Sequence, residues 1–331
     1  MKVIIPLAGF GKRLRPHTYS KPKPLLNVAG KAVLGHVLDK LHGLDIEEII
    51  FIVGYLGEQI EEYVTANYDF PARYVEQKEL LGQAHAIWLA REHVQDDVLI
   101  LFVDTIFEAD LTPLRDLRSD GVIYCKEVDD PRRFGVVTLD EEGIITRFVE
   151  KPREAVSNLA VIGLYYLKDA PALMEAIDEL IQRNIQTKGE YFLADALQIL
   201  VDRGFRFNAW TVEVWEDCGT PEAVLHTNRY LLEHGHGNDT QVETFNSVII
   251  PPVHIAPTAR VENSVIGPYV TIGEQATVRR SIIRDSIIDA GAIIEDAMLD
   301  QSLVGRDALV RERFRRFNVG DSSAVDFSPM P

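Results

Sequence analysis

The chain of 331 residues has few cysteines, no long apolar runs and little positive charge. Its two cysteines, Cys125 and Cys218, lie far apart, which excludes a zinc pattern and a disulfide framework. No apolar run reaches the roughly 18–20 residues that span a bilayer, and the first run, Val3–Ala8, is too short for a signal peptide. The net charge of −17 argues against a nucleic-acid surface, which would need a basic face. These absences predict a cytoplasmic globular protein that contacts neither membrane nor nucleic acid.

Up to residue 235, short apolar runs alternate with segments of helical period. The runs predict strands at Val3–Leu7, Ile49–Val53, Val98–Val103, Gly121–Cys125, Gly135–Leu139, Ile144–Val149 and Val161–Leu167. The helical segments are Ala32–His42, Glu58–Ala66, Gln83–His93, Leu111–Leu117, Ala170–Gln182, Glu190–Asp202 and Pro221–Glu233. Such alternation indicates βαβ units. It predicts an α/β domain over 1–235 with a Rossmann-like, mostly parallel sheet and helices on both faces.

A different pattern follows a predicted linker at 236–247. From Val248 onward an aliphatic residue recurs in steps of five or six. Four glycines stand among these residues at predicted corners: Gly267, Gly273, Gly291 and Gly305. Short repeats of this kind favour a parallel β-helix, here a left-handed one of hexapeptide type, over 248–331. A β-sandwich is the less favoured alternative because hairpin turn signals are few.

A glycine-rich loop with several cations follows the first predicted strand. Ala8, Gly9 and Gly11 would let the backbone approach a ligand, and their N–H groups can bind phosphate oxygens. Arg13 and Lys23 add positive charge on or near the loop. The third glycine of a dinucleotide fingerprint is missing, and so is the Gly-Lys-Ser/Thr of a Walker A loop. By itself, the loop is equally consistent with a tight turn beside a basic surface.

Together with its neighbours, the loop has a recognisable order. Gly9-x-Gly11-x-Arg13-Leu14, then Pro22-Lys23-Pro24-Leu25-Leu26 and Val28-Ala29-Gly30-Lys31, resembles the signature of sugar-phosphate nucleotidylyltransferases. These enzymes make nucleotide sugars. The resemblance implies catalytic, phosphate-binding roles for Arg13 and Lys23. The nucleotide-binding residues it implies in the loop are Leu7, Ala8, Gly9, Gly11 and Lys12.

Two positions depart from the family pattern. Lys12 stands where the family usually has threonine, and Ala32 where it usually has proline. Lys12 adds a positive charge that is compatible with a polyphosphate and could change its affinity.

The segment Gln77–Ala86 resembles the part of the family that recognises the base, which implies nucleotide-binding roles for Gln77 and Gly82. A glutamine amide can both donate to and accept from a pyrimidine edge. Taken alone, the segment is an ordinary connection between a strand and a helix.

Two aspartates stand in segments that the resemblance assigns to a metal. Asp104 follows an apolar predicted strand, and Asp217 lies just before Cys218 and Gly219. The family places an aspartate in each of these segments to hold Mg²⁺, an ion that prefers oxygen ligands. Val103 replaces a glycine that is common in the family, so Asp110 is an alternative ligand. A helix N-cap is the more ordinary role for Asp110.

The implied sugar-phosphate site comes from later segments, with Gly135, Glu150, Lys151 and Val161 as its residues. A carboxylate such as Glu150 can accept two sugar hydroxyls, and Lys151 can pair with the phosphate. The structural alternative for the Glu150–Lys151 segment is a surface strand that ends at a turn. The segment Ser157–Gly163 looks most like enzymes that combine dTTP or UTP with glucose 1-phosphate.

The resemblance therefore implies a Mg²⁺-dependent enzyme that forms a nucleotide sugar and pyrophosphate from a nucleoside triphosphate and a sugar 1-phosphate. The coils are expected to serve contact between subunits, which would give a homo-oligomer, or regulation. Three alternatives stay open: a mannose-1-phosphate guanylyltransferase, a bifunctional acyltransferase, and a non-catalytic regulator that binds nucleotide sugars. The acyltransferase would need a histidine in the coils, where only His254 lies.

Overall fold

The computed structural model describes residues 1–238, 244–312 and 319, apart from the side chains at 115 and 116. The chain forms two compact units, Met1–His236 and Gly237–Pro331, each with its own core. Residues 239–243 of the predicted linker, and all but one residue of the tail after 312, lie outside the described part. In that part, no helix combines the length and apolar character needed to cross a membrane.

The first unit is built on a mixed sheet, one half of which is parallel. In this half the strand order is β6-β1-β4-β5. The bounds are Lys2–Pro6 for β1, Glu48–Val53 for β4, Ala72–Glu76 for β5 and Val98–Leu101 for β6. Strands β1, β4 and β6 are apolar on both faces because both faces are covered. Their carboxyl ends lie at one edge of the sheet.

The other half adds antiparallel pairing, which the alternation of strands and helices did not reveal. Strand β11 (Leu159–Leu167) runs antiparallel to β6, and also pairs with β8 (Gly121–Glu127) and β9 (Gly135–Leu139). Strand β10 (Ile145–Glu150) pairs antiparallel with β9, and β12 (Phe207–Thr211) is parallel to β8. This half carries the sugar-phosphate residues predicted from the sequence.

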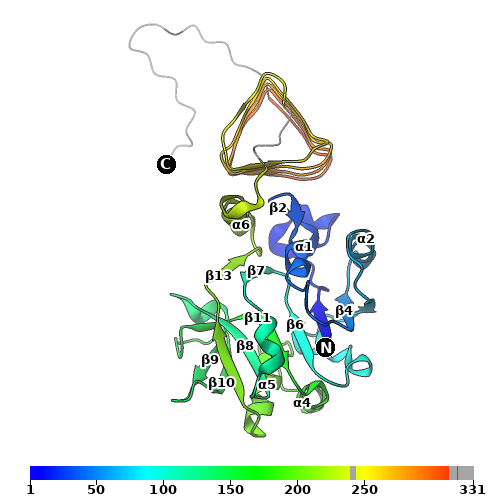
Figure 1. The fold of residues 1–331 in the computed structure, drawn as a ribbon, viewed down its shortest axis with the longest axis vertical. Helices are drawn as coiled ribbons and strands as arrows, with labels where there is room; N and C mark the ends of the chain where they lie inside the picture. The colour runs from blue at the N-terminus through cyan, green and yellow to red at the C-terminus, as the bar shows by residue number, and fades with distance from the viewer. Residues whose placement is uncertain (239–243, 313–318, 320–331) are drawn as a thin grey trace. The chain divides into compact units, whose positions relative to one another are not determined.

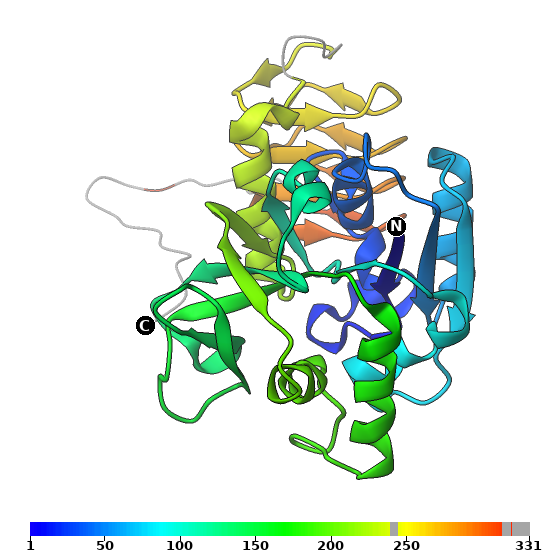
Figure 2. The same ribbon diagram turned by 60° about the horizontal axis from the view of Figure 1, so that its bottom comes forward.

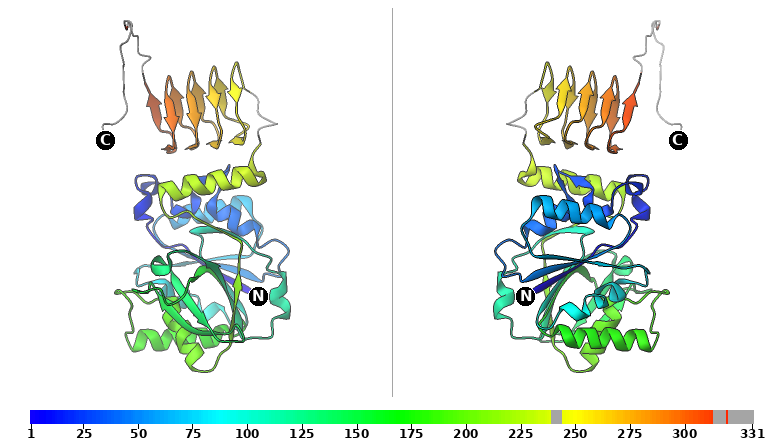
Figure 3. Two further views of the ribbon diagram at one scale, coloured as in Figure 1. Left: turned by 90° about the vertical axis from the view of Figure 1, so that its left-hand side faces the viewer. Right: turned by 90° about the vertical axis from the view of Figure 1, so that its right-hand side faces the viewer.

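Helices cover both faces of the sheet (Figure 3). One face packs on α3 (Gln83–Trp88), α4 (Ala170–Gln182) and α5 (Leu193–Asp202), through a core that includes Ile4. The opposite face packs on α1 (Val33–Asp39) and α2 (Gly57–Asn67), through a core that includes Val3 and Ile5. Neighbouring residues of β1 thus point to opposite faces, as the period of a strand requires.

Some predicted elements are shorter or of another type. The segment Gln83–His93 divides into α3 and a 3₁₀ turn at Arg91–His93. The predicted helix Leu111–Leu117 is a 3₁₀ helix at Thr112–Asp116, which Pro113 restricts near its start. Asp110 accepts hydrogen bonds from the Thr112 backbone nitrogen (2.9 Å) and hydroxyl (2.6 Å), so it closes the turn before this helix.

The second unit is a coil with three parallel sheets, seen along its axis as a triangle in Figure 1 and as stacked layers in Figure 2. One sheet contains β14 (Val248–Ile249), β17 (Val265–Ile266), β20 (Ile282–Arg284) and β23 (Met298–Asp300). The second contains β15 (Val253–Ile255), β18 (Val270–Ile272), β21 (Ser286–Ile288) and β24 (Leu303–Val304). The third contains β16 (Arg260–Glu262), β19 (Thr277–Arg279), β22 (Ile293–Glu295) and β25 (Leu309–Arg311).

The spacing of aliphatic residues in the sequence explains the length of each coil. Val248 pairs with Val265 on the next coil, and Ile282 pairs in the same way with Met298. Both intervals are slightly shorter than three steps of six, because each coil contains one or two steps of five. The repeat stacks aliphatic residues such as Ile266 and Ile283 in the core. The coils match the predicted parallel β-helix and are consistent with its left hand.

Residues at the corners adopt backbone conformations that suit tight bends. Gly267 and Gly291 have φ values of 106° and 69°, as expected for glycine corners. Asn263, Arg280 and Asp296 take the left-handed conformation without being glycines, with φ between 45° and 56°. Glycine spacing alone therefore identifies only some of the corners.

Candidate active site

The predicted phosphate loop begins where β1 ends, and its residue Gly11 packs against Thr18 and Lys23. Gly11 has a φ of 59° and precedes the 3₁₀ turn Lys12–Leu14. A Cβ on Gly11 would lie 3.0 Å from Cγ2 of Thr18 and 3.1 Å from Cβ of Lys23, so a larger residue would crowd both side chains. Pro22 introduces a second 3₁₀ turn, Lys23–Leu25, that carries the lysine itself. The loop and the Pro-Lys-Pro segment are thus one packed structure.

Lys23 and Asp104 form an ion pair, with 3.5 Å between Nζ and Oδ2. The side chain of Lys23 is 15% exposed and that of Asp104 is 51% exposed. The ion pair is therefore accessible to solvent at the edge of the sheet and is not part of the core. Asp104 follows β6, the neighbour of β1, which is why two segments far apart in the sequence meet here. Ligands bind at such edges in open α/β sheets.

Asp217 reaches the same place through a two-stranded sheet that sequence reasoning did not predict. Strand β7 (Thr105–Glu108) pairs antiparallel with β13 (Val214–Asp217), and Thr105 lies opposite Asp217. The backbone nitrogen of Cys218 donates to the carbonyl of Asp104 at 2.9 Å. The two predicted metal-binding aspartates are therefore held by one hydrogen-bonded ribbon.

Gly219 leaves room beside Asp217. Its backbone nitrogen donates to Oδ1 of Asp217 at 2.7 Å. A Cβ on Gly219 would lie 2.8 Å from that oxygen and 3.0 Å from Nη2 of Arg13. The guanidinium and the carboxylate thus both lie against this glycine.

One cavity of about 420 Å³ is lined by all seven predicted nucleotide residues, together with Arg13, Lys23 and Asp104. Lys12, the departure from the family pattern, lines this cavity, with Nζ 5.9 Å from the ring centre of Phe10. The unusual charge therefore lies beside the loop that would hold the triphosphate.

Gln77 is buried and its amide nitrogen is engaged within the protein. Nε2 donates to the carbonyl of Gly82 at 3.3 Å and lies 3.1 Å from Nδ1 of His85. Gly82 has a φ of 118°, and a Cβ there would come within 2.5 Å of the carbonyl oxygen of Tyr191. These contacts of Nε2 tie Gln77 to Gly82 and His85 beside the first cavity, which Gln77 and Gly82 both line.

A second cavity, of about 340 Å³, is lined by the four predicted sugar-phosphate residues and by Asp217. A Cβ on Gly135 would lie 2.8 Å from Oε2 of Glu150, so glycine allows β9 to approach this carboxylate. Lys151 lies 3.2 Å from Glu150, and its Nζ is 4.7 Å from the ring centre of Phe192. Burial raises the pKa of Glu150, and the charge of Lys151 opposes that shift.

A bulge in β11 shapes part of the lining of the second cavity. Its pairing with β8 shifts between Val161 and Tyr165, where Gly163 has a φ of 88°. The backbone nitrogen of Phe102 donates to the carbonyl of Gly163 at 2.8 Å. Val161, at the bulge, faces the second cavity.

Both cavities are lined by Arg13, Gln83, Phe102 and Asp104, so they meet at these residues. Of these four, Gln83 and Phe102 were missed from the sequence, although both adjoin predicted motifs. Trp215 was also missed. Its ring contacts Phe134 edge-on at 4.9 Å, and its buried Nε1 has no hydrogen-bond partner among the described residues.

Two aspartates in the second cavity offer carboxylate oxygens that suit a divalent cation. Asp104 and Asp217 both line the second cavity. In the described ranges, no three His, Cys, Asp or Glu side chains gather into a metal-binding group. Two carboxylates suit a divalent cation that takes its other ligands from water and substrate phosphates.

Sequence profiles of two families match the two units of the chain. A profile described as nucleotidyl transferase matches residues 2–234. A second one, described as GlmU-like, C-terminal hexapeptide, matches residues 238–285. The two matches together confirm the resemblance seen in the sequence motifs.

Relatives extend this likeness over nearly the whole length. The low-salt glycan biosynthesis nucleotidyltransferase Agl11 of Haloferax volcanii is 32% identical, across 99% of this chain and 96% of its own. A glucose-1-phosphate thymidylyltransferase of Streptomyces antibioticus is 30% identical, across 98% of this chain and 99% of its own. A crystal structure of UDP-glucose pyrophosphorylase complexed with UDP-glucose has a TM-score of 0.63 and 24% identity. The match covers 70% of this chain and 98% of the chain in that crystal structure, and at this identity it supports only the fold. The chain belongs to the nucleotidyl transferase family.

Proposed function

We propose that the chain joins a nucleoside triphosphate to a sugar 1-phosphate, with dTTP or UTP and glucose 1-phosphate as the preferred substrates. The observation that carries this proposal is the meeting of two cavities at Arg13 and Asp104. One cavity is lined by the nucleotide residues that the family resemblance implies, and the other by the sugar-phosphate residues. The choice of substrates rests on the segment Ser157–Gly163 and on the thymidylyltransferase similar to this chain.

The chemistry requires alignment and neutralisation of charge more than a base. A phosphate oxygen of the sugar 1-phosphate attacks the α-phosphorus in line, a new P–O bond forms, and the bond to the pyrophosphate leaving group breaks. The attacking oxygen is already anionic near neutral pH, so no proton must be removed. Repulsion between two polyanions is the main barrier, and Arg13 and Lys23 are placed to lower it.

We propose Mg²⁺ as the metal, held by Asp104 and Asp217. When bound, the ion would neutralise phosphate charge and hold the triphosphate in one orientation. Lys23, 3.5 Å from Asp104, positions that carboxylate and adds a second positive charge beside it.

The second cavity offers groups that suit a sugar phosphate. Glu150 is a largely buried carboxylate that lines this cavity and can accept from sugar hydroxyls. Lys151 is a cation next to that carboxylate and suits the phosphate.

Pyrophosphate release tests this function directly. The full chain with Mg²⁺ is combined with each of dTTP, UTP, GTP, ATP and CTP against glucose, mannose, galactose and N-acetylglucosamine 1-phosphates. We expect the highest kcat/KM with dTTP or UTP and glucose 1-phosphate. A maximum with GTP and mannose 1-phosphate would instead identify a guanylyltransferase. No turnover with any pair, together with measurable binding of nucleotide sugars, would indicate a regulator.

An acyltransferase activity of the coils has weaker support. The match to a GlmU-like hexapeptide profile raises the question. His254, the histidine of the coils, lies on β15, in the first of the described coils. Incubation with acetyl-coenzyme A and an amino sugar phosphate, followed by an assay for free thiol, tests for acyl transfer. Release of coenzyme A would show the activity, and no release would exclude it for these substrates.

A further inference from the structure

Two buried polar side chains stand next to each other on α6 (Pro221–Leu231), the helix that follows Asp217. Thr227 and Asn228 are both fully buried. Burial of a polar group is costly unless the group forms hydrogen bonds, so the partners of these two side chains are informative. Each of them contacts the backbone of a segment that belongs to the candidate active site.

Thr227 contacts the segment of Asp217. Its hydroxyl donates to the carbonyl oxygen of Asp217 at 2.8 Å. The next backbone nitrogen, that of Cys218, donates to the carbonyl oxygen of Asp104 at 2.9 Å. This carbonyl and this N–H group belong to one trans peptide unit, so they point in opposite directions. The peptide unit is therefore held between α6 on one side and the backbone of Asp104 on the other.

Asn228 ties the same turn of α6 to the segment of Lys23. Its Oδ1 accepts from the backbone nitrogen of Ala29 at 2.8 Å. Ala29 lies at the turn between β2 (Asn27–Val28) and β3 (Lys31–Ala32), and this hairpin follows the 3₁₀ turn that carries Lys23. One turn of α6 therefore supports the backbone of segments that are far apart in the sequence and meet at the active site.

We propose that Thr227 is a positioning residue that sets the spacing of the Asp104 and Asp217 carboxylates, and so their affinity for a divalent cation. Loss of the hydroxyl would remove the donor that α6 offers to the Asp217 carbonyl. If the peptide then turned toward another partner, the bond from Cys218 to Asp104 would loosen and both carboxylates would shift. Residues that support metal ligands in this way commonly change metal affinity or activity by about 10–100-fold when they are replaced. The inference rests on the proposed function and adds a residue that acts through Asp217.

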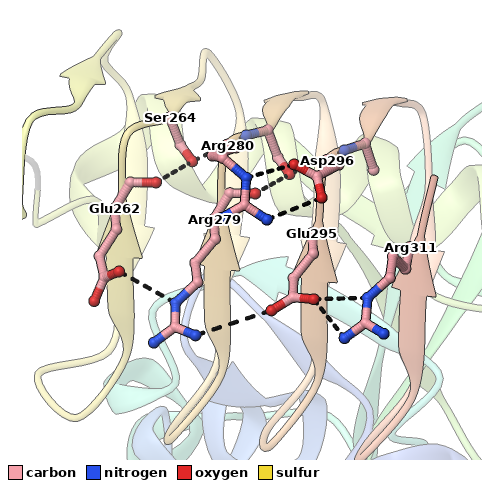
Figure 4. A network of polar contacts seen from close by, with 9 residues as sticks. Glu262, Ser264, Arg279, Arg280, Glu295, Asp296 and Arg311 are labelled. Atoms are coloured by element: carbon pink, nitrogen blue, oxygen red, sulfur yellow. Dashed lines mark hydrogen bonds and ion pairs between the residues drawn. The ribbon is translucent and has the colours of Figure 1, made fainter. Parts of the chain in front are cut away.

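A bond from a hydroxyl to a carbonyl can also serve stability alone, and the coil unit provides an example. The hydroxyl of Ser264, a residue that is 4% exposed, donates to the carbonyl of Glu262 at 2.8 Å (Figure 4). This bond is as long as that of Thr227, but Ser264 belongs to the coil unit, whereas residues of the first unit line both cavities. Ser264→Ala is therefore a matched control that removes a buried hydroxyl away from the candidate active site.

Two substitutions at Thr227 separate positioning from packing. Thr227→Val keeps the shape of the side chain and removes the donor, whereas Thr227→Ser keeps the donor and removes a methyl group. Binding of Mn²⁺ to the full chain, measured from the electron paramagnetic resonance of the free ion, reports on the carboxylates without any turnover. We expect Thr227→Val to raise the dissociation constant for Mn²⁺ by about tenfold. Thr227→Ser and Ser264→Ala should leave it nearly unchanged.

Pyrophosphate release gives a second readout. Thr227→Val should lower kcat by about tenfold, because a small displacement of aligned groups is costly to the rate. The KM for the sugar 1-phosphate should stay unchanged, since the predicted residues of that site lie on or next to β9, β10 and β11. Thr227→Ser should restore normal turnover, and Ser264→Ala should keep it.

The two readouts distinguish a failure of this inference from a failure of the proposed function. Equal Mn²⁺ affinity in the native chain and Thr227→Val, or equal losses of affinity in the valine and serine variants, would overturn the positioning role. A native chain that binds no Mn²⁺ would overturn it as well. If the native chain binds Mn²⁺ but releases no pyrophosphate, the proposed function fails, and the Mn²⁺ comparison still decides the role of Thr227.

Discussion

The catalytic unit assembles its site from segments far apart in the sequence, whereas the coil unit pairs each strand with the corresponding strand of the next coil. In the first unit, Lys23, Asp104 and Asp217 meet because separate strands end at one edge of a sheet. In the second, the same kind of contact repeats in every coil. Loss of one residue should therefore have different consequences in the two units: lost activity in one, and a local loss of stability in the other.

The largest effect is expected at Lys23. Lys23→Ala removes a cation that lies 3.5 Å from Asp104 at the junction of the two cavities, and we expect kcat to fall by about 10²–10³-fold. The urea midpoint should change little. Lys31→Ala, at an exposed lysine paired with Asp39, is the matched control and should keep normal turnover. Near-normal turnover of Lys23→Ala would refute the mechanism.

The coil unit offers a pair of adjacent isoleucines that separates core from surface. Ile283 is fully buried and Ile282 is 45% exposed. Ile283→Ala should lower the free energy of unfolding of the coils by about 2–5 kcal/mol, because it leaves a cavity between stacked coils. Ile282→Ala should change it by less than about 0.5 kcal/mol. Hydrogen exchange localises the loss, and equal losses for both variants would contradict the assigned core.

A smaller effect concerns acid stability of the catalytic unit. Burial lowers the pKa of His36 to about 4, while an unfolded histidine titrates near 6.5. Between these values the unfolded chain binds more protons, so stability falls as the pH drops below 6.5. Urea titrations at pH 7.5 and 5 should show about 2 kcal/mol more loss for the native chain than for His36→Gln. Parallel losses would show that His36 does not control this range.

The smallest effect is expected at Lys12. Lys12→Thr restores the residue usual in the family and removes one charge beside the phosphate loop. We expect the KM for the triphosphate to rise about three- to tenfold, with kcat nearly unchanged, because a cation open to solvent contributes roughly 1 kcal/mol. A fall in kcat without a change in KM would place Lys12 at the reacting phosphate instead.

The local sequence predicted much of each unit, and the misses have physical causes. The apolar strands β1, β4 and β6 stand out because both of their faces are buried. Strand β5, with the sequence Ala-Arg-Tyr-Val-Glu, lies at one side of the sheet and is only partly covered, so it lacks an apolar run. Strands β7 and β13 are short and exist because they pair with each other, which no local pattern reveals.

The same division applies to the site. The glycines and cations of the first loop could be read directly, since backbone approach and phosphate charge demand those residue types. Gln83, Phe102 and Trp215 could not, because a glutamine or an aromatic residue has no special pattern until the fold turns it toward a cavity. The order of the motifs, more than any one of them, made the family recognisable.

By itself, the sequence determined the structural class of each unit. The first unit has a βαβ pattern, and the second has aliphatic residues spaced by five or six positions. The sums of these spacings set the number of residues in each coil. These properties are local, because they depend on periodicity and on burial of neighbouring residues. Only the tertiary structure decided that β11 runs antiparallel and bulges at Gly163, and that the β7–β13 ribbon joins Asp104 to Asp217. Each of these depends on pairing between distant segments, whose partners are chosen by the folded chain as a whole.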